Sequence, residues 1–396
     1  MRLVHLSDLH LGYRQYQRLT PGGINQREAD VAATFRASID SVIALRPDLV
    51  VVAGDIFHTV RPTNQAILHG FLQLSRLKAA LPESEIVLIA GNHDTPRSSE
   101  SGGILQLFAQ LGINIADTKP QLWNFPKLDL SVLGVPDVPG QTRPELRPAP
   151  GARFNVMVIH GEVQGVLPVH LASAERAALE ISHEELGAAR WDYVALGHYH
   201  VYREVAPNAF YSGSIDYTSA NTWGELHEQR AAGLSGKGFI ERNLITGEHI
   251  FHPLRPSRPL IDLEPVSVRG LTIAEVDAKI SAAVESCAGG IDDKVVRLLV
   301  RDVPRHLPRE LDHKAIRDYK RRALNFQLDF RAPEIPRLHA TGAPGRRPSL
   351  NDIVKERLRT RPLDADVDRE ALMARAIAYL DQAQAMNVAP SAVEEV

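Results

Sequence analysis

Residues 2–10 read RLVHLSDLH, an apolar run that stops at Ser7 and is followed by the polar side chains of Asp8 and His10. The length and composition of Arg2–Leu6 predict a buried β-strand. Ligand-type side chains directly after a strand are informative, because open α/β sheets bind their ligands at the carboxyl ends of their strands. One such pair could arise by chance, but the same arrangement returns four more times along the chain.

The four other predicted strands end in the same way. They are Leu49–Ala53 before Asp55, Ile86–Ala90 before Asn92, His93 and Asp94, Val156–Ile159 before His160, and Tyr193–Leu196 before His198 and His200. Five strand ends of this kind in one chain predict an assembled metal site. The side chains are Asp, His and Asn without Cys, which suits Mn²⁺ or Fe²⁺ better than a structural zinc. Two such ions form a clamp for a phosphoryl group and a source of hydroxide.

Within this set, Asp55 is the expected bridging carboxylate. One metal would take Asp8, His10 and His200, and the other Asn92, His160 and His198. The amide oxygen of Asn92 is neutral, so the site stays positive enough to attract a phosphodiester. His93 is expected to donate a proton to the leaving oxygen or to stabilise charge on the phosphoryl group. Asp94 would hydrogen-bond the His93 imidazole and fix its tautomer.

The composition is that of an ordinary globular protein. The 396 residues are 44% hydrophobic and 23% charged, enough for two or three domains. The net charge of −3 weakens a nucleic-acid-binding interpretation without excluding it, since two metal ions would add positive charge to one face. Cys287 is the only cysteine, so no intramolecular disulfide is possible. Met1 leads directly into a strand and no apolar run approaches the roughly 20 residues of a membrane helix, so we expect a cytoplasmic protein without a signal peptide.

Helical and strand patterns alternate through residues 1–255. Apolar positions at helical spacing predict helices over Arg27–Leu45, Asn64–Ala80 and Ile104–Leu111. The proline-rich Pro136–Ala152 is expected to be a loop. Further strands are predicted over Phe210–Ser212, Phe239–Leu244 and His249–His252. This alternation indicates a layered α/β fold.

Three further segments follow this core. Residues 256–332 predict a small α+β module: strand Leu260–Leu263, helix Ile273–Ala288, strand Lys294–Val300, helix His313–Ala323 and strand Asn325–Phe330. Residues 333–348 are rich in Pro, Gly and Arg and are predicted to be a linker. Residues 349–396 predict two amphipathic helices, the first capped by Ser349 and the second over about Asp366–Ala385.

The order of the ligand motifs resembles that of the calcineurin-like metallophosphoesterase superfamily: Asp-x-His, Gly-Asp, Gly-Asn-His-Asp, a lone His and Gly-His-x-His. Within it the chain is most similar to the SbcD-type nuclease subunits of DNA double-strand-break repair complexes. The similarity includes Leu11–Arg14, Ile56–His58, Asp94–Arg97 and Gly213-Ser214. It covers residues 1–255 well, the following module moderately and the C-terminal helices weakly. It implies a four-layer α-β-β-α core with a capping module and a C-terminal helical segment.

The resemblance also implies a function. It predicts a metal-dependent exonuclease and endonuclease that processes double-strand ends by attack of a metal-bound hydroxide. His58 would lie near the site and help act on DNA strands, and four arginines would contact phosphates: Arg14, Arg18, Arg61 and Arg97. Residues 256–332 would cap the DNA groove, and residues 349–396 would bind the coiled coil of an SbcC-like ATPase. A homodimer through helices such as Asn64–Leu81 is a further expectation.

Two departures from the family pattern and two alternatives remain open. Residues 219–236 form a Gly/Ala-rich stretch that is longer than the family needs, and Ser212 stands where a proline is usual before Gly213. A phosphodiesterase for small molecules or cyclic nucleotides would use the same fold, because fold does not fix substrate. A mainly architectural subunit, bridging DNA and the ATPase, would need the metal site less. His5 and His69 are expected to serve packing rather than metal binding.

Overall fold

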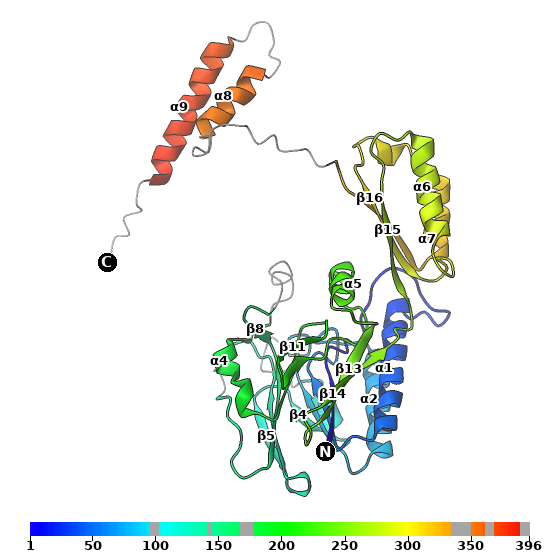
Figure 1. Cartoon of the computed structure of the whole chain (residues 1–396), viewed down its shortest axis with the longest axis vertical. Coiled ribbons are helices and arrows are strands. Elements are labelled where there is room, and N and C mark those ends of the chain that lie inside the picture. The colour runs from blue at the N-terminus through cyan, green and yellow to red at the C-terminus, as the bar shows by residue number, and fades with distance from the viewer. Residues whose placement is uncertain (96–102, 141–144, 167–176, 334–349, 361–367, 389–396) are drawn as a thin grey trace. The chain divides into compact units, whose positions relative to one another are not determined.

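The computed structural model describes residues 1–95, 103–140, 145–166, 177–333, 350–360 and 368–388. The chain divides into two compact units, Met1–Pro333 and Glu334–Val396. Figure 1 shows both units with their helices and strands.

The first sheet contains the strands that the N-terminal motifs follow. Its order is β14 (His249–Leu254), β13 (Lys237–Asn243), β1 (Arg2–Leu6), β2 (Leu49–Ala53), β3 (Glu85–Ile89) and β4 (Asn114–Ala116). Strands β1 to β4 are parallel, whereas β13 pairs antiparallel with β1 and with β14. The carboxyl ends of β1, β2 and β3 therefore meet at one edge of the sheet.

The second sheet contains the other two motif strands. Its order is β11 (Arg203–Ala206), β12 (Ala209–Tyr211), β10 (Tyr193–Gly197), β7 (Phe154–His160), β6 (Leu130–Val135) and β5 (Gln121–Phe125). Strands β7 and β10 are parallel neighbours, with Gly197 opposite His160. A two-stranded sheet of β8 (Glu162–Val163) and β9 (Glu180–Ile181) follows the end of β7.

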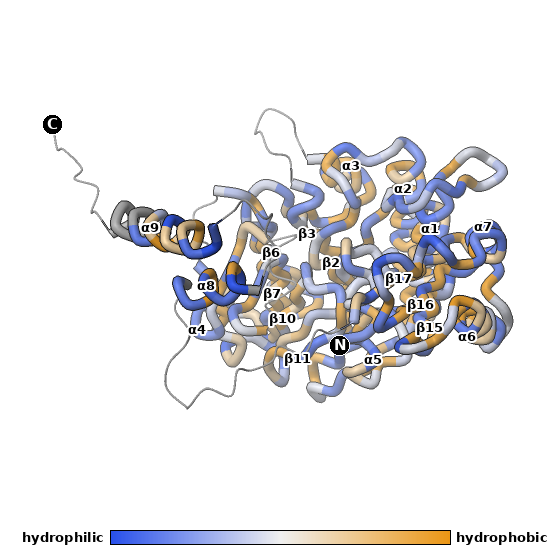
Figure 2. The backbone as a smooth tube through the Cα atoms, turned by 90° about the horizontal axis from the view of Figure 1, so that it is seen from above, coloured by the Kyte–Doolittle hydropathy of each residue, from blue (hydrophilic) through white to orange (hydrophobic). Residues whose placement is uncertain are grey.

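The two sheets stack face to face with an apolar core between them. The side chains of β1 point alternately into this core and toward the helices on the other side. Leu3 belongs to the core shared with the second sheet, while Val4 and Leu6 face the helices on the other side. Strand residues alternate between faces, so a strand buried on both sides must be apolar throughout. Strands β7 and β10 have the same character (Figure 2).

Helices cover the outer face of the first sheet. They are α1 (Gln26–Leu45), α2 (Asn64–Ala80) and the short α3 (Gln106–Ala109), a shorter helix than the predicted Ile104–Leu111. The side chain of Asn25 caps α1, and that of Thr63 caps α2. Figure 1 shows α1 and α2 side by side along the sheet. The layered α/β architecture predicted from the sequence is confirmed.

The outer face of the second sheet is covered differently. Among the described residues it carries the four-residue helix α4 (His183–Leu186), which the 3₁₀ turn η2 (Ala188–Arg190) follows, and loop residues such as Leu146 complete this core. The 3₁₀ turn η1 (Pro126–Leu128) joins β5 to β6. The fourth layer of the expected α-β-β-α core is thus built largely from short elements and loops.

A small parallel unit follows the core. Strands β15 (Leu260–Ser267), β16 (Val295–Arg301) and β17 (Asn325–Phe330) pair in parallel, with α6 (Ile273–Glu285) and α7 (His313–Arg322) as crossovers and η3 (Leu307–Arg309) before α7. Val276, Ile280 and Val284 of α6 bury one face of this sheet. Leu260, Val295 and Leu324 on its other face contact residues of the core. We call residues 256–332 the cap.

Helix α5 (Thr222–Ala231) lies within residues 219–236, the Gly/Ala-rich stretch that departs from the family pattern. Its side chains contact both the core and the cap. Trp223 donates a hydrogen bond from Nε1 to Gln327 Oε1 (3.0 Å), and the Arg297 guanidinium lies 4.8 Å from the Trp223 ring centroid. The stretch is therefore a folded element that joins two parts of the first unit.

The second unit is a helix pair. Helix α8 (Leu350–Thr360) packs against α9 (Arg369–Val388), and Asn351 Nδ2 donates to Asp381 Oδ1 at 2.9 Å. Except for Pro333, the predicted linker lies outside the described residues, as does Ser349. No helix in the described parts of the chain has the length and apolarity to cross a membrane.

Candidate metal centre

All five predicted strand ends meet where the two sheets approach each other. Glycines make this approach possible. A Cβ on Gly197 would lie 1.7 Å from the carbonyl oxygen of Ala53, and one on Gly54 would lie 2.2 Å from His160 Nδ1. A Cβ on Gly91 would lie 2.1 Å from Asp55 Oδ1. The glycines in the motifs therefore permit backbone contacts that no side chain would allow.

The backbone at the site is held in an uncommon conformation. Asp8, His10, Asp55 and His198 have φ values of 52°, 47°, 52° and 102°. This left-handed region costs roughly 1–2 kcal/mol for a non-glycine residue. The loops after β1 and β2 are joined by hydrogen bonds, from Asp8 N to Gly54 O (3.0 Å) and from His10 N to Asp55 O (2.9 Å). These contacts hold the strained residues in place, as is common at functional sites.

The first predicted ligand group comes together around two histidines. The Nε2 atoms of His10 and His200 lie 3.0 Å apart, and His200 Nε2 lies 4.0 Å from Asp8 Oδ1. These three side chains bring one ligand atom each within 4.8 Å of one another. Bonds of about 2.1 Å to one ion place neighbouring ligand atoms about 3 Å apart in octahedral geometry. The spacing fits a shared cation.

The second predicted group forms around Asn92. Its Oδ1 lies 3.0 Å from His160 Nε2 and 3.3 Å from His198 Nδ1. His160 Nδ1 lies 2.8 Å from the carbonyl oxygen of Ala53. A carbonyl oxygen only accepts, so Nδ1 carries the proton and Nε2 presents its lone pair to the site.

Asp55 lies between the two groups, as predicted for a bridging carboxylate. Its Oδ2 is 3.7 Å from His10 Nε2 and 3.5 Å from His160 Nε2. Its Oδ1 accepts the backbone N–H of His93 at 2.9 Å. Asp8 is held similarly, accepting the backbone N–H of His198 at 3.0 Å. The donor set and its spacing are compatible with a dinuclear metal site.

Burial sets the protonation of the groups at the site. It lowers the pKa values of His10 and His200 well below their usual range, with further lowering by neighbouring charges. Burial raises the pKa of Asp8 to about 6, and the nearby His160 opposes that shift. Neutral imidazole is the form that binds metals, so His10 and His200 are in the state that ligation needs.

His93 and His58 lie beside the first group, together with His10. The rings of His58 and His93 stack with centroids 5.3 Å apart, and His58 Nδ1 lies 3.3 Å from His10 Nδ1. Burial and, to a smaller extent, the charge of His93 lower the pKa of His58 from 6.5 to about 4. Both histidines therefore adjoin the first ligand group.

The expected role of Asp94 is corrected by the structure. The oxygen 2.8 Å from His93 Nδ1 is the backbone carbonyl of His58, not the carboxylate of Asp94. Asp94 is buried and accepts backbone N–H groups of Ile56, Phe57 and Gly91. Burial raises the pKa of Asp94 to about 7, and Asp55 adds to the shift. Asp94 thus shapes the loops after β2 and β3, because backbone amides are the nearest donors to its carboxylate.

The predicted phosphate-binding arginines differ in their surroundings. Arg14 Nε donates to Glu28 Oε2 at 2.7 Å. Arg18 Nη2 donates to the carbonyl oxygens of Arg321 and Ala323 in the cap, both at 2.8 Å, so it serves the attachment of the cap. Arg61 is exposed in the loop after His58. Arg97 lies outside the described residues.

Three charged residues at the site were not expected, and two of them, Glu225 and Lys237, are buried. Glu162 Oε1 lies 3.2 Å from His198 Nε2. Glu225 and Lys237 form an ion pair beside His200. The position of Glu162, two residues after His160, was a signal that could have been used. Glu225 and Lys237 gave none, because they approach His200 only through the placement of α5 and β13.

His5 and His69 have the packing roles expected of them. His5 is buried between the sheets, with Nδ1 3.0 Å from the hydroxyl of Tyr193. His69 Nε2 lies 2.8 Å from the carbonyl oxygen of Ala32.

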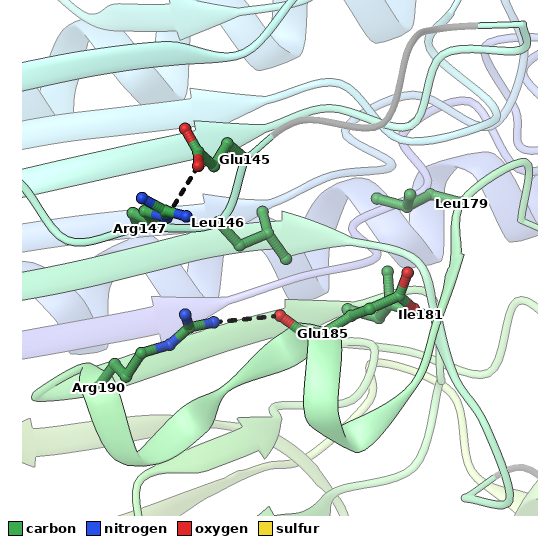
Figure 3. Close-up of a pocket in the computed structure, with 7 residues that line it drawn as sticks. All are labelled: Glu145, Leu146, Arg147, Leu179, Ile181, Glu185 and Arg190. Atoms are coloured by element: carbon green, nitrogen blue, oxygen red, sulfur yellow. Dashed lines mark hydrogen bonds and ion pairs between the residues drawn. The ribbon is translucent and has the colours of Figure 1, made fainter.

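A pocket of about 200 Å³ opens on the far side of the second sheet (Figure 3). Apolar Leu146, Leu179 and Ile181 line it, and the rim carries Glu145, Arg147, Glu185 and Arg190. No lining residue belongs to the predicted metal set, so this pocket is separate from the candidate centre.

Comparison with known proteins places this geometry in a family. A family model described as calcineurin-like phosphoesterase matches residues 1–202. The chain is 40% identical over 102 residues to a protein of Methanococcus maripaludis, covering 26% of this chain and 25% of that one. It is 25% identical over 250 residues to a protein of Methanocaldococcus jannaschii, covering 60% and 61%. It is 30% identical over 261 residues to a protein of Methanosarcina acetivorans, covering 62% and 39%.

All three relatives are named DNA double-strand break repair protein Mre11. The chain spans between about a quarter and three fifths of their lengths. The resemblance to SbcD-type nuclease subunits, inferred from the motifs, is confirmed by these relatives and by the family model. The chain belongs to the calcineurin-like phosphoesterase family.

Proposed function

We propose that this chain is a metal-dependent nuclease that processes DNA double-strand ends. The observation that carries the proposal is the position of Asp55 between two ligand groups drawn from both sheets. The name shared by the relatives, a double-strand-break repair protein, supports DNA as the substrate. The proposed metals are two Mn²⁺ ions, with Fe²⁺ as the second choice, because the donors are imidazoles, carboxylates and one amide.

Seven side chains would hold the ions: Asp8, His10, Asp55, Asn92, His160, His198 and His200. When bound, two such ions supply a nucleophile from water near neutral pH and neutralise charge on the phosphoryl group. His93 would protonate the leaving oxygen, with its ring oriented by the bond from Nδ1 to the carbonyl oxygen of His58. His58 would act next to it on the DNA strand.

The partners are proposed from the same resemblance. The α8–α9 pair would bind the coiled coil of an SbcC-like ATPase. A homodimer would form through α2, where Leu68 and Leu72 are 56% and 54% exposed. Exposed leucines in one helical stripe are typical of a protein interface. The cap would lie over the DNA groove, and the exposed Arg61 would contact a phosphate.

The test is Mn²⁺-dependent degradation of a linear, end-labelled duplex by the full chain. Controls are Mg²⁺ alone, a chromogenic phosphodiester, and the Asp55→Ala and Asn92→Ala proteins, each checked for folding by circular dichroism. We expect duplex cleavage that disappears in both variants. Turnover of the small ester with an untouched duplex would favour the small-molecule phosphodiesterase instead. A variant without cleavage that still binds DNA separates catalysis from scaffolding.

A further inference from the structure

A buried ion pair lies behind one of the proposed metal ligands. Glu225 of α5 and Lys237 of β13 are 4% and 3% exposed. Lys237 Nζ donates to Glu225 Oε1 and to the carbonyl oxygen of His200, the latter at 2.7 Å. The hydroxyls of Ser214 and Ser219 donate to the two oxygens of Glu225 at 3.1 and 2.8 Å. The carboxylate is thus held in one place by three neighbours.

The ring of His200 lies between this pair and the metal ligands. Its Nε2 faces His10 and Asp8, as described above. Its Nδ1 is buried, has no hydrogen-bond partner among the described residues, and lies 3.9 Å from Glu225 Oε1. A neutral imidazole that uses Nε2 as a ligand carries its proton on Nδ1. That proton would therefore face the carboxylate of Glu225.

The other proposed histidine ligands of the second sheet have an oxygen at hydrogen-bond distance from the ring nitrogen that faces away from the centre. His160 has the Ala53 carbonyl oxygen behind it, and His198 has Glu162. Histidines that bind metals almost always give their other ring N–H to such an oxygen, which fixes the tautomer and makes the ligand more basic. Glu225 supplies the accepting oxygen in the corresponding place for His200, 3.9 Å from its Nδ1.

We propose that Glu225, held by Lys237, is a positioning residue for His200. It orients the imidazole and accepts a hydrogen bond from the Nδ1–H group when Nε2 binds a cation. The proposal rests on the proposed metal centre. Lys237 has two tasks in it. It compensates the charge of the buried carboxylate, and its bond to the His200 carbonyl fixes the backbone of the ligand.

The competing explanation is that the pair only joins α5 to β13. The melting temperature and the affinity for Mn²⁺ distinguish the structural explanation from the positioning role. Replacing a buried ion pair by apolar residues of similar volume is often neutral for stability. The double variant Glu225→Leu/Lys237→Met removes the carboxylate without leaving a lone buried charge. Glu225→Gln is the milder variant, and Glu228→Gln on the same helix is the matched control, because Glu228 contacts the Tyr199 hydroxyl rather than His200.

The experiment is calorimetric titration of Mn²⁺ into the chelator-treated full chain, with the melting temperature of the metal-free protein measured in parallel. We expect two classes of site in the wild type and in Glu228→Gln. In the double variant one class should weaken by about 10–100-fold while the other is retained. Glu225→Gln should weaken the same class by a smaller factor.

Wild-type affinity at both sites in the folded double variant would overturn the proposal and leave the pair a purely structural role. Equal weakening of both classes would also overturn it, since His200 belongs to one group only. A wild-type protein that binds no Mn²⁺ would instead contradict the proposed metal centre itself.

Discussion

Single residues at the strand ends differ in which atom faces the metal centre. The ring of His93 is oriented by the contact of its Nδ1 with the His58 carbonyl oxygen at 2.8 Å. We expect His93→Gln to lower duplex cleavage by about 100–10,000-fold, the usual contribution of a general acid. Metal content, measured by elemental analysis, should remain that of the wild type. Loss of metal in this variant would show that His93 is a ligand instead. The control is His227→Gln, because His227 is exposed on α5.

His5 gives a prediction for the pH dependence of stability. Burial lowers its pKa from 6.5 to about 3, so the unfolded chain binds a proton that the folded chain does not. The stabilisation is fully present above pH 6.5 and is lost as the pH falls from 6.5 toward 3. Over the first unit of that range the loss is about 1 kcal/mol.

The measurement is urea unfolding of the metal-free protein at pH 7.5 and 5.5. We expect the His5→Gln protein to lose less unfolding free energy than the wild type between these pH values, by about 1 kcal/mol. Identical losses in both proteins would mean that His5 does not contribute to acid sensitivity.

At the scale of elements, α5 connects the core and the cap. Trp223 contacts Gln327 and Arg297 of the cap, while Glu225 contacts Lys237 of the core. We expect Trp223→Ala to lose a hydrogen bond and a cation–π contact, together about 1–2 kcal/mol. Amide hydrogen exchange should become faster in β15 and β17 and stay unchanged in β1. His227→Ala on the same helix should leave all three strands unchanged, and unchanged β17 exchange in Trp223→Ala would contradict the coupling.

Most of the individual elements could be predicted from the sequence, because their patterns are local. The bounds predicted for β1, β2 and α2 agree with the structure, since each shows a clear apolar run or stripe between turn residues. Helix α5 was not predicted, because Trp223 and Leu226 are its only large apolar side chains and two positions do not form a helical stripe. The prediction that Asp94 hydrogen-bonds His93 was wrong. Asp94 accepts backbone N–H groups of the loop after β2, and the position of that loop follows only from the tertiary structure.

At the scale of the whole molecule, every proposed metal ligand lies in the unit Met1–Pro333. Helices α8 and α9 pack against each other within the second unit, and Ile353 and Tyr379 are 49% and 61% exposed. We predict that removing residues 349–396 keeps Mn²⁺-dependent cleavage of short duplexes at the wild-type rate. The same truncation should abolish binding to an SbcC-like ATPase in a pull-down experiment. Retained binding would mean that the partner docks on the first unit.

The sequence by itself predicted the proposed ligand set and determined the strands that carry it and the layered class of the fold, because these depend on local patterns and on motif order. Only the tertiary structure decided which oxygens stand behind the ligands. Glu225 and Lys237 are separated from His200 by 25 and 37 positions in the sequence, and Arg18 is separated from its contact in the cap, Arg321, by 303. Contacts of that kind depend on how sheets and helices pack, and no local periodicity encodes them.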